Sequence, residues 1–158
     1  QNLKNKNNVS DTNVLVNLID KNGIKNINNI LDGMYAFIVY DKVKNQILIN
    51  RDPQGEKIIY IFEDNNEIIF SSEINSIVHY KKNIKLNINI LKNYFYTRHF
   101  TQFDKTIFKN IKILEPGHLK ILDLKTFRFK IHSKFSLNDL VNPVEYNRND
   151  KTTTPKNN

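Results

Sequence analysis

The 158-residue sequence contains no cysteine, which excludes disulfides, thiolate zinc sites and a thiol nucleophile within these residues. It has only four glycines, no two of them near each other, so it contains no glycine-rich phosphate-binding loop. No apolar run approaches the roughly 20 residues of a membrane-spanning helix, and no signal-peptide pattern opens the chain. His79, His99, His118 and His132 share no metal-ligand spacing. We therefore expect a cytoplasmic protein with no metal site and no membrane partner.

The composition is typical of one globular domain with a surplus of positive charge. Apolar residues make up 39% and charged residues 25% of the chain, which is long enough to bury a core of its own. The formal net charge of +8 is carried mostly by Lys, spread among Asn and Ile. A coding bias toward these residue types gives the same balance, so we do not expect nucleic acid as a partner. The chain opens on Gln1 rather than Met, which suggests a processed or partial polypeptide.

A helix is expected at the start of the folded region. Ser10 or Asp11 can accept a hydrogen bond from the first free amides of the helix, and Gly23 can end it in a left-handed conformation. Its apolar residues recur at helical spacing and should form one buried stripe: Val14, Leu15, Leu18 and Ile19. A second, shorter helical pattern covers residues 24–31.

Two hairpins are expected next. Residues 34–40 are all apolar or aromatic, which predicts a strand covered on both faces. Residues 46–50 should pair with that strand after a polar turn. Residues 58–62 and 67–70 predict a second hairpin, because the Asp and Asn residues between them tolerate the positive φ angles of tight turns.

The second half of the sequence predicts two helices and further strands. Ser72 and Glu73 should open a helix, with the Ser72 hydroxyl as cap and the Glu73 carboxylate at the positive end of the helix dipole. The remaining expected elements are a helix over about 87–98, a short strand ending at Leu114, a turn at Pro116-Gly117, and a hairpin of 118–122 with 126–135.

These elements define one folded region between two polar ends. We expect a polar lead-in over residues 1–9, a domain over 10–135, and a polar, disordered tail or linker over 136–158. The order of helices and strands, with sheets that are apolar on both sides, predicts an α+β layered sandwich.

Several short blocks of residues recur in a characteristic order. They are Gly33-Met34-x-Ala36-Phe37, Arg51-Asp52-Pro53-x-Gly55, Tyr60, Ser71-Ser72-Glu73, Thr106-Ile107-Phe108-Lys109-x-Ile111 and Pro116-Gly117-His118. Each block alone is weak, but together they resemble the class II glutamine amidotransferase domain of asparagine synthetases. Two departures stand out: Ile58-Ile59, where many members of that family carry Pro, and Glu115, where they carry a second Pro before Pro-Gly-His.

The resemblance implies the C-terminal part of a glutaminase domain with an αββα sandwich of the N-terminal nucleophile hydrolase type. In this family an N-terminal cysteine thiolate attacks the amide of glutamine. The released ammonia travels through an internal channel to a second domain, where ATP activates aspartate and asparagine forms. This chain holds neither that cysteine nor the ATP-binding loop. The resemblance therefore implies no catalytic residue and no cofactor here, with ATP and Mg²⁺ belonging to the absent synthetase domain.

Two residues carry family roles in this segment. Asp11 matches the family aspartate that pairs with the α-ammonium group of glutamine, and the alternative is that it only helps to cap its helix. Met34 matches a methionine that lines the ammonia passage, and the alternative is ordinary core packing.

The other matching residues are interpreted as structural. For Arg51 and Asp52 we expect a turn held by a buried ion pair or by Arg51 bonding backbone carbonyls, in preference to catalysis. Gly55 should supply a conformation that other residues resist. The full set of expected structural residues is Gly33, Arg51, Asp52, Gly55, Ser72, Glu73 and Gly117.

Three hypotheses for function follow. The first is part of the glutaminase domain of an asparagine synthetase, inactive alone, with glutamine as substrate and the missing N-terminal half and synthetase domain as partners. The second is a non-catalytic amidotransferase-like module kept for binding or regulation. The third is a basic nucleic-acid-binding domain.

Overall fold

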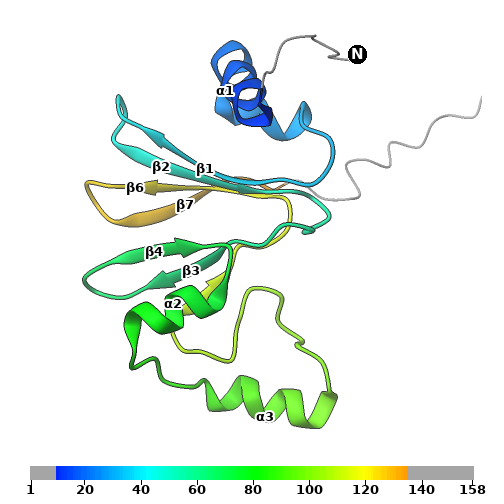
Figure 1. Cartoon of the computed structure of the whole chain (residues 1–158), viewed down its shortest axis with the longest axis vertical. Coiled ribbons are helices and arrows are strands. Elements are labelled where there is room, and N and C mark those ends of the chain that lie inside the picture. Colours follow the sequence, from blue (N-terminus) through cyan, green and yellow to red (C-terminus); the bar gives the residue numbers. More distant parts are fainter. Residues whose placement is uncertain (1–9, 135–158) are drawn as a thin grey trace, which may run out of the picture.

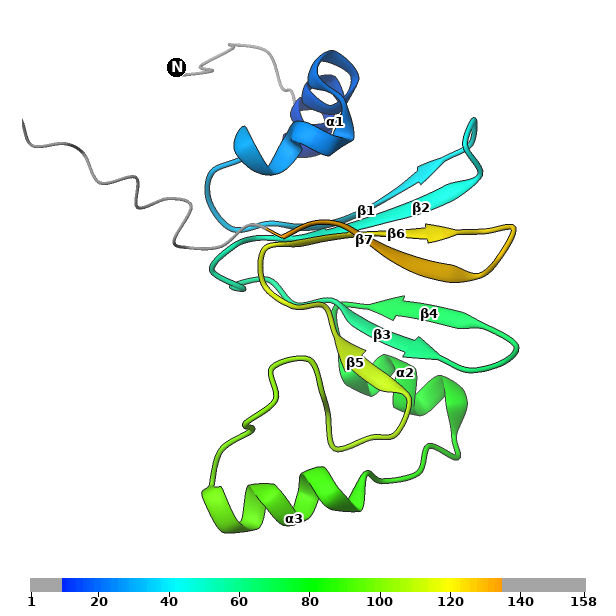
Figure 2. The ribbon, with the colours of Figure 1, turned by 180° about the vertical axis from the view of Figure 1, so that it is seen from behind.

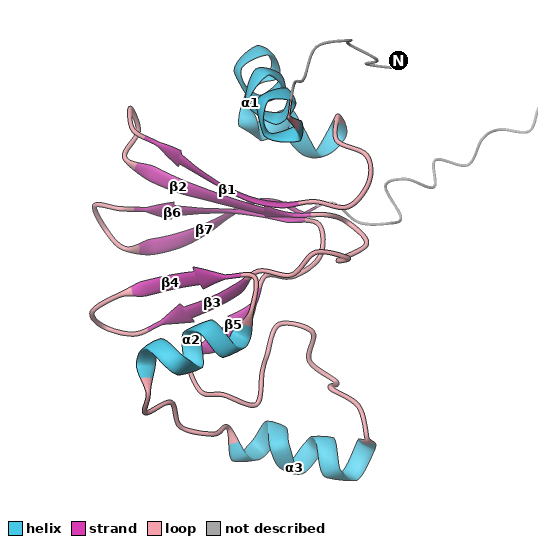
Figure 3. Cartoon of the chain, viewed as in Figure 1, coloured by secondary structure: helices cyan, strands magenta, loops and turns pink. Residues whose placement is uncertain are grey.

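The computed structural model describes residues 10–134, whose helices and sheets lie in four layers (Figure 1). Helix α1 (Asp11–Asn22) lies on one side, and helices α2 (Ile74–Lys81) and α3 (Ile88–Thr97) lie on the other. Both sheets lie between these helices, as the colouring by secondary structure makes plain (Figure 3). The predicted lead-in and tail lie outside the described residues. None of the described helices is long and apolar enough to cross a membrane.

The larger sheet joins two hairpins that are distant in the sequence. Its strands are β1 (Ala36–Asp41), β2 (Gln46–Arg51), β6 (His118–Asp123) and β7 (Arg128–Lys134). They lie in the order β1-β2-β6-β7, and every neighbouring pair is antiparallel. The β1–β2 turn closes because the Asp41 carboxylate accepts hydrogen bonds from the two amides of residues 43–44, each at 3.0 Å. The predicted first and last hairpins are therefore both confirmed.

The smaller sheet is built from the predicted middle hairpin and one short strand. Its strands β3 (Tyr60–Glu63), β4 (Ile68–Ser71) and β5 (Ile111–Ile113) lie in the order β4-β3-β5 and are antiparallel. The chain passes from β2 to β3 and from β5 to β6 at the same end of the two sheets (Figure 2). These two crossings, residues 52–59 and 114–117, therefore lie side by side and tie the sheets together.

Alternating side chains place two apolar cores around the smaller sheet. Ile49, Ile61 and Leu114 pack between the two sheets, each at most 6% exposed. Phe62, which follows Ile61 and so points to the opposite face, packs with residues of α2 and β5. The smaller sheet is thus covered on both faces, as a sheet between two layers requires.

The helix ends were predicted with mixed success. Ser10 caps α1 as expected, because its side-chain oxygen accepts a hydrogen bond from the Asn13 amide at 3.4 Å. Gly23 has the expected positive φ of 76°, but its ψ of 143° is extended, so the cap is not left-handed. The prediction that Ser72 caps α2 is wrong. Glu73 is the N-cap residue, and its side chain makes no capping bond.

Two predictions about burial are also wrong. The apolar stripe of α1 is only half-buried, and no residue of that helix is fully buried. The strand after Gly33 begins at Ala36 and is open on one side, with Ile38 45% and Tyr40 53% exposed. Ile38 lies opposite the buried Ile49, on the face toward the smaller sheet. The smaller sheet has three strands and the larger sheet has four, so the smaller sheet does not cover this face of the edge strand β1.

Candidate functional site

A hollow of about 570 Å³ opens between α1, the start of β1 and the turn after β2. We call it the Met34 hollow; its lining residues are Leu15, Met34, Tyr35, Ala36, Phe37, Glu56, Lys57, Ile58 and Ser72. Gly33, with φ at 103°, lets the chain turn into β1 so that Met34 and Tyr35 reach the hollow. Four segments that are separate in the sequence therefore meet at one place.

The structure brings two of the residues singled out in the sequence directly into this hollow. Met34 lines it with a side chain that is 64% exposed, which does not fit ordinary core packing. Ser72 contributes from the end of β4. Asp11 is not part of the lining, but it precedes Leu15 by four residues on α1 and so shares the helix face that Leu15 presents to the hollow.

Tyr35 is a site residue that the sequence reasoning missed. Its hydroxyl is buried and has no hydrogen-bond partner among the residues that the structure describes. Burial raises the pKa of Tyr35 to about 12, and the charge of Asp52 adds to this effect. The Tyr35 side chain is therefore a neutral phenol at the wall of the hollow. The sequence shows only an aromatic residue inside an apolar run, which carries no such signal.

The Arg51 guanidinium joins the turn after β2 to the crossing that leads into β6. Its three nitrogens donate to backbone carbonyls: Nε to Lys57 at 2.5 Å, Nη1 to Leu114 at 2.6 Å and Nη2 to Gly55 at 2.5 Å. Arg51 is 6% exposed, and burial lowers the pKa of its guanidinium while the nearby Asp52 opposes that shift. Two structural roles were expected for Arg51, a buried ion pair or hydrogen bonds to backbone carbonyls. The structure shows the hydrogen bonds to carbonyls.

The Asp52 carboxylate is fully buried and is satisfied by the backbone of its own turn. Its two oxygens accept hydrogen bonds from the amides of Glu56 at 2.9 Å and Lys57 at 3.0 Å. The Asp52 amide donates to the Tyr35 carbonyl at 2.9 Å, which fixes the turn against the strand that enters the hollow. These bonds position the residues of the hollow and leave no carboxylate oxygen exposed for catalysis.

The two crossings between the sheets interlock through glycines. Gly55 has φ at 72°, and a Cβ atom there would lie 2.8 Å from Cγ of Pro116. The Gly117 amide donates to the Asp52 carbonyl at 2.9 Å. Only glycine fits position 55, because both the backbone conformation and the contact with Pro116 exclude a side chain.

The Ser71-Ser72-Glu73 block forms a turn at the entry of α2. The Ser71 hydroxyl accepts a hydrogen bond from the Glu73 amide at 3.1 Å and donates to the Glu73 carbonyl at 2.8 Å. Ser71 therefore organises the turn, and the neighbouring Ser72 faces the hollow.

The described residues offer binding groups but no reactive centre. Within residues 10–134 no group of three or more His, Cys, Asp or Glu side chains could hold a metal ion. The sequence has no cysteine. The Met34 hollow combines apolar walls and a neutral phenol with two charged residues, Glu56 and Lys57. Such a hollow can hold or pass a small polar molecule but cannot attack it.

Comparisons with known proteins agree with this picture. A family profile described as glutamine amidotransferase domain matches residues 1–134. A protein of Methanocaldococcus jannaschii, provisionally named glutamine-hydrolysing asparagine synthetase 2, is 38% identical over 118 residues, which are 73% of this chain and 22% of that protein. Glutamine-hydrolysing asparagine synthetase 2 of Bacillus subtilis is 30% identical over 152 residues, which are 89% of this chain and 19% of that protein.

A more distant relative, the glutamine-hydrolysing asparagine synthetase of Gallus gallus, is 24% identical over 116 residues, which are 73% of this chain and 17% of that protein. The chain spans about a fifth of the length of the first two relatives. The profile match covers most of the chain, including every described helix and strand. The chain therefore belongs to the glutamine amidotransferase domain family, and these relatives are asparagine synthetases that hydrolyse glutamine.

Proposed function

We propose that this chain is the C-terminal part of the glutaminase domain of a glutamine-dependent asparagine synthetase. The whole enzyme would convert ATP, aspartate and glutamine to asparagine, glutamate, AMP and diphosphate. The observation that carries the proposal is the Met34 hollow, where α1, the Gly33-Met34 loop and the Ser72 turn meet. The four layers in Figure 1 support an αββα sandwich of the N-terminal nucleophile hydrolase type.

Asp11 is proposed to bind the α-ammonium group of glutamine. Its carboxylate is exposed at the first turn of α1, on the helix face that leads to Leu15 and the hollow. Ser10 provides the cap, so the Asp11 side chain is not needed for that task. A charge-assisted hydrogen bond between a carboxylate and an ammonium group is stronger than a neutral one and would orient the substrate.

Met34 is proposed to line the path that ammonia takes. A thioether and the neighbouring apolar side chains neither donate nor accept protons, so ammonia would pass along the Met34 side of the hollow, away from Glu56 and Lys57, without being trapped as ammonium. Tyr35 suits such a path because a phenol is uncharged at neutral pH, and burial raises its pKa further, to about 12. The other matching residues, among them Arg51, Asp52 and Gly55, would hold this wall in place through their bonds to the backbone.

The reactive groups would come from polypeptide outside this sequence. Hydrolysis of the glutamine amide needs a thiolate nucleophile and an oxyanion hole in this family, and the sequence supplies no thiol. ATP and Mg²⁺ are proposed to bind in the synthetase domain.

The passage role can be tested with Met34→Glu in the intact enzyme. A carboxylate at the Met34 side, in addition to that of Glu56, would stabilise ammonia as ammonium once it has taken a proton from water, so glutamate should form in excess of asparagine, whereas the two products should remain equal in the parent protein. Val43→Glu is the matched control, because Val43 is 95% exposed in the β1–β2 turn. Equal product formation in the Met34 variant would argue against the passage.

A non-catalytic amidotransferase-like module remains the second candidate, favoured by the absence of cysteine from the sequence. The same assay separates the two candidates. If the intact protein forms no glutamate from glutamine, while it still binds glutamine, the module is the correct description.

A further inference from the structure

The positive charge of this protein is concentrated in one segment. Residues 81–112 hold eight Lys or Arg residues and one carboxylate, so they carry +7 of the net charge of +8. The cations are Lys81, Lys82, Lys85, Lys92, Arg98, Lys105, Lys109 and Lys112. All of them except Lys81 are exposed. The segment comprises the end of α2, all of α3 and the long loop that leads to β5.

The backbone places some of these cations side by side. Lys105 and Lys112 are directly opposite each other in an antiparallel bridge, where Lys112 lies on the Ile61 side of β5 and shares a hollow with Glu63 and Asp104. The Lys109 amide donates to the Lys85 carbonyl at 2.8 Å, which brings a second pair together. Like charges that face each other across paired strands are destabilising. Among the described residues, Lys81 alone in this segment makes salt bridges, with Asp64 at 2.9 Å and Glu67 at 2.6 Å.

An apolar hollow of about 350 Å³ opens in the same segment. Phe100 and Phe103 of the long loop line it together with Ile74 of α2 and Ile113 of β5, and Lys105 also contributes to its lining. Phe103 is 80% and Phe100 is 50% exposed. Exposed aromatic rings beside an apolar hollow are typical of anchor sites in protein interfaces.

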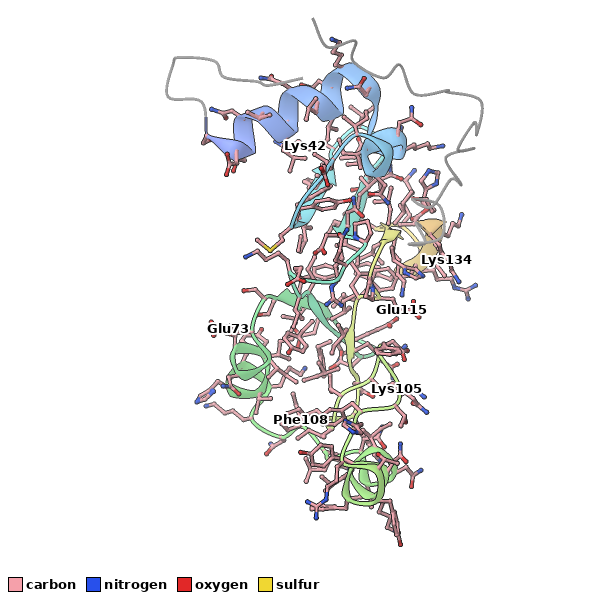
Figure 4. The ribbon with its side chains drawn as sticks, turned by 90° about the vertical axis from the view of Figure 1, so that its right-hand side faces the viewer. Lys42, Glu73, Lys105, Phe108, Glu115 and Lys134 are labelled. Carbon is pink, nitrogen blue, oxygen red and sulfur yellow. The ribbon has the colours of Figure 1, made fainter. Side chains whose placement is uncertain are left out.

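We propose that this basic face, formed by residues 81–112, docks a separate acidic protein that inserts one apolar side chain into the hollow. The carboxylates of the partner would pair with exposed cations of the long loop, Lys105 at the hollow among them. A single large apolar side chain would cover Phe100 and Phe103. In Figure 4, Lys105 and Phe108 lie toward α3, whereas Lys42 lies near the opposite end of the molecule. The linings of the two hollows approach each other where Ser72 is followed two residues later by Ile74, but the proposal rests on the cations and aromatic rings of residues 81–112 and does not depend on the glutaminase role.

The observations favour an acidic protein over other occupants. A second copy of the chain would offer little acidic surface, because the residues outside this segment carry a net charge of only +1. Nucleic acid is recognised by cations that follow its backbone and by aromatic rings that stack on bases. Here Phe100 and Phe103 line a hollow with aliphatic side chains, which suits an inserted side chain better than a stacked base.

The test measures binding of a fluorescein-labelled, glutamate-rich peptide with one central leucine to the intact protein by fluorescence anisotropy at low salt. Lys105→Glu combined with Lys109→Glu, both at exposed positions of the long loop, should weaken binding by about tenfold, which corresponds to about 1.4 kcal/mol. Phe103→Ala should also weaken it. The matched control is Lys42→Glu with Lys125→Glu, which makes the same change in charge at two exposed turns of the larger sheet and should leave binding unchanged.

Four results would overturn the proposal. The first would be that the peptide fails to bind at low salt. The second would be that the control pair weakens binding as much as the pair in the basic face, because that result would indicate attraction by net charge alone. A thymidine oligonucleotide binds more tightly than the peptide and displaces it, which would indicate a nucleic-acid site. The protein dimerises in sedimentation experiments and Phe103→Ala abolishes the dimer, which would make the occupant a second copy.

Discussion

At the scale of single residues, Arg51 ties the two crossings between the sheets to each other through hydrogen bonds to the carbonyls of Gly55, Lys57 and Leu114. Arg51, Asp52 and Gly55 were interpreted as parts of a structural turn, and each is engaged in that turn. The acceptor that ties Arg51 to the other crossing is the carbonyl of Leu114, 63 positions further along the chain. Local patterns cannot predict such a partner, because it depends on how the two sheets stack.

Gly55→Ala should destabilise the protein more than Gly23→Ala. Both positions have positive φ, which costs an alanine about 1 to 3 kcal/mol. A Cβ at Gly55 would also meet Pro116 at 2.8 Å, whereas nothing lies within 4 Å at Gly23. We expect a loss of about 3 kcal/mol for Gly55→Ala. Urea titration followed by circular dichroism measures both, and equal losses would show that the contact with Pro116 is unimportant.

Tyr35→Phe should stabilise the protein or leave its stability unchanged. The buried hydroxyl has no partner among the described residues, so removing it should recover about 1 kcal/mol of desolvation cost. The urea midpoint of the variant is the measurement. A decrease in the midpoint would mean that the hydroxyl makes a bond that stabilises the fold.

At the scale of elements, the type and order of the helices and strands could be predicted, and their ends and exposure less well. Turn residues such as Asp41 and caps such as Ser10 act within a few positions, so the sequence shows them directly. The open face of β1 was missed because an all-apolar strand looks the same whether or not a neighbouring sheet covers it. Ile38 is exposed only because the facing sheet has fewer strands.

The same lesson holds for the segment around α3. The lysines were read as evenly spread, although a count by segment places nearly all of the excess charge in residues 81–112. That signal was available in the sequence. The pairing that sets Lys105 opposite Lys112 was not, because it depends on the path of the loop between α3 and β5.

The link between α2 and the β3–β4 turn should make stability depend on pH. The hydrogen bond from Lys81, followed by bonds from backbone amides, lowers the pKa of Asp64 from 3.8 to about 2. Because the pKa of Asp64 is lower in the folded state, its charged carboxylate stabilises the protein at pH values above the ordinary pKa. This contribution is lost as the pH falls from about 4 to about 2. The urea midpoint should therefore decrease over this window.

Asp64→Asn should make that decrease shallower. It should not abolish the decrease, because backbone amides also lower the pKa values of Asp41 and Asp123. Asp20→Asn, an exposed change on α1, is the control and should leave the slope as it is. An unchanged slope in the Asp64 variant would show that the contact with Lys81 does not contribute.

At the scale of the whole molecule, two hollows are proposed to have different tasks. One, the Met34 hollow, gathers α1, the Gly33-Met34 loop and the Ser72 turn. The other opens beside the long loop after α3, within the basic face. The interlocked crossings, with Arg51 between them, tie the two sheets together. The layered fold could be predicted from the sequence, whereas the meeting of distant segments at the hollow required the structure.

The most direct test of the central claim, that this chain helps to bind glutamine for asparagine synthesis, is the effect of Asp11→Asn on the intact enzyme. The account predicts that the KM for glutamine rises by about tenfold, the loss of about 1.4 kcal/mol expected for one charge-assisted bond. Synthesis from added ammonia should be unchanged, and Asp20→Asn on the same helix should alter neither reaction. An unchanged KM for glutamine in the Asp11 variant, or an equal loss of the ammonia-dependent reaction, would contradict the account.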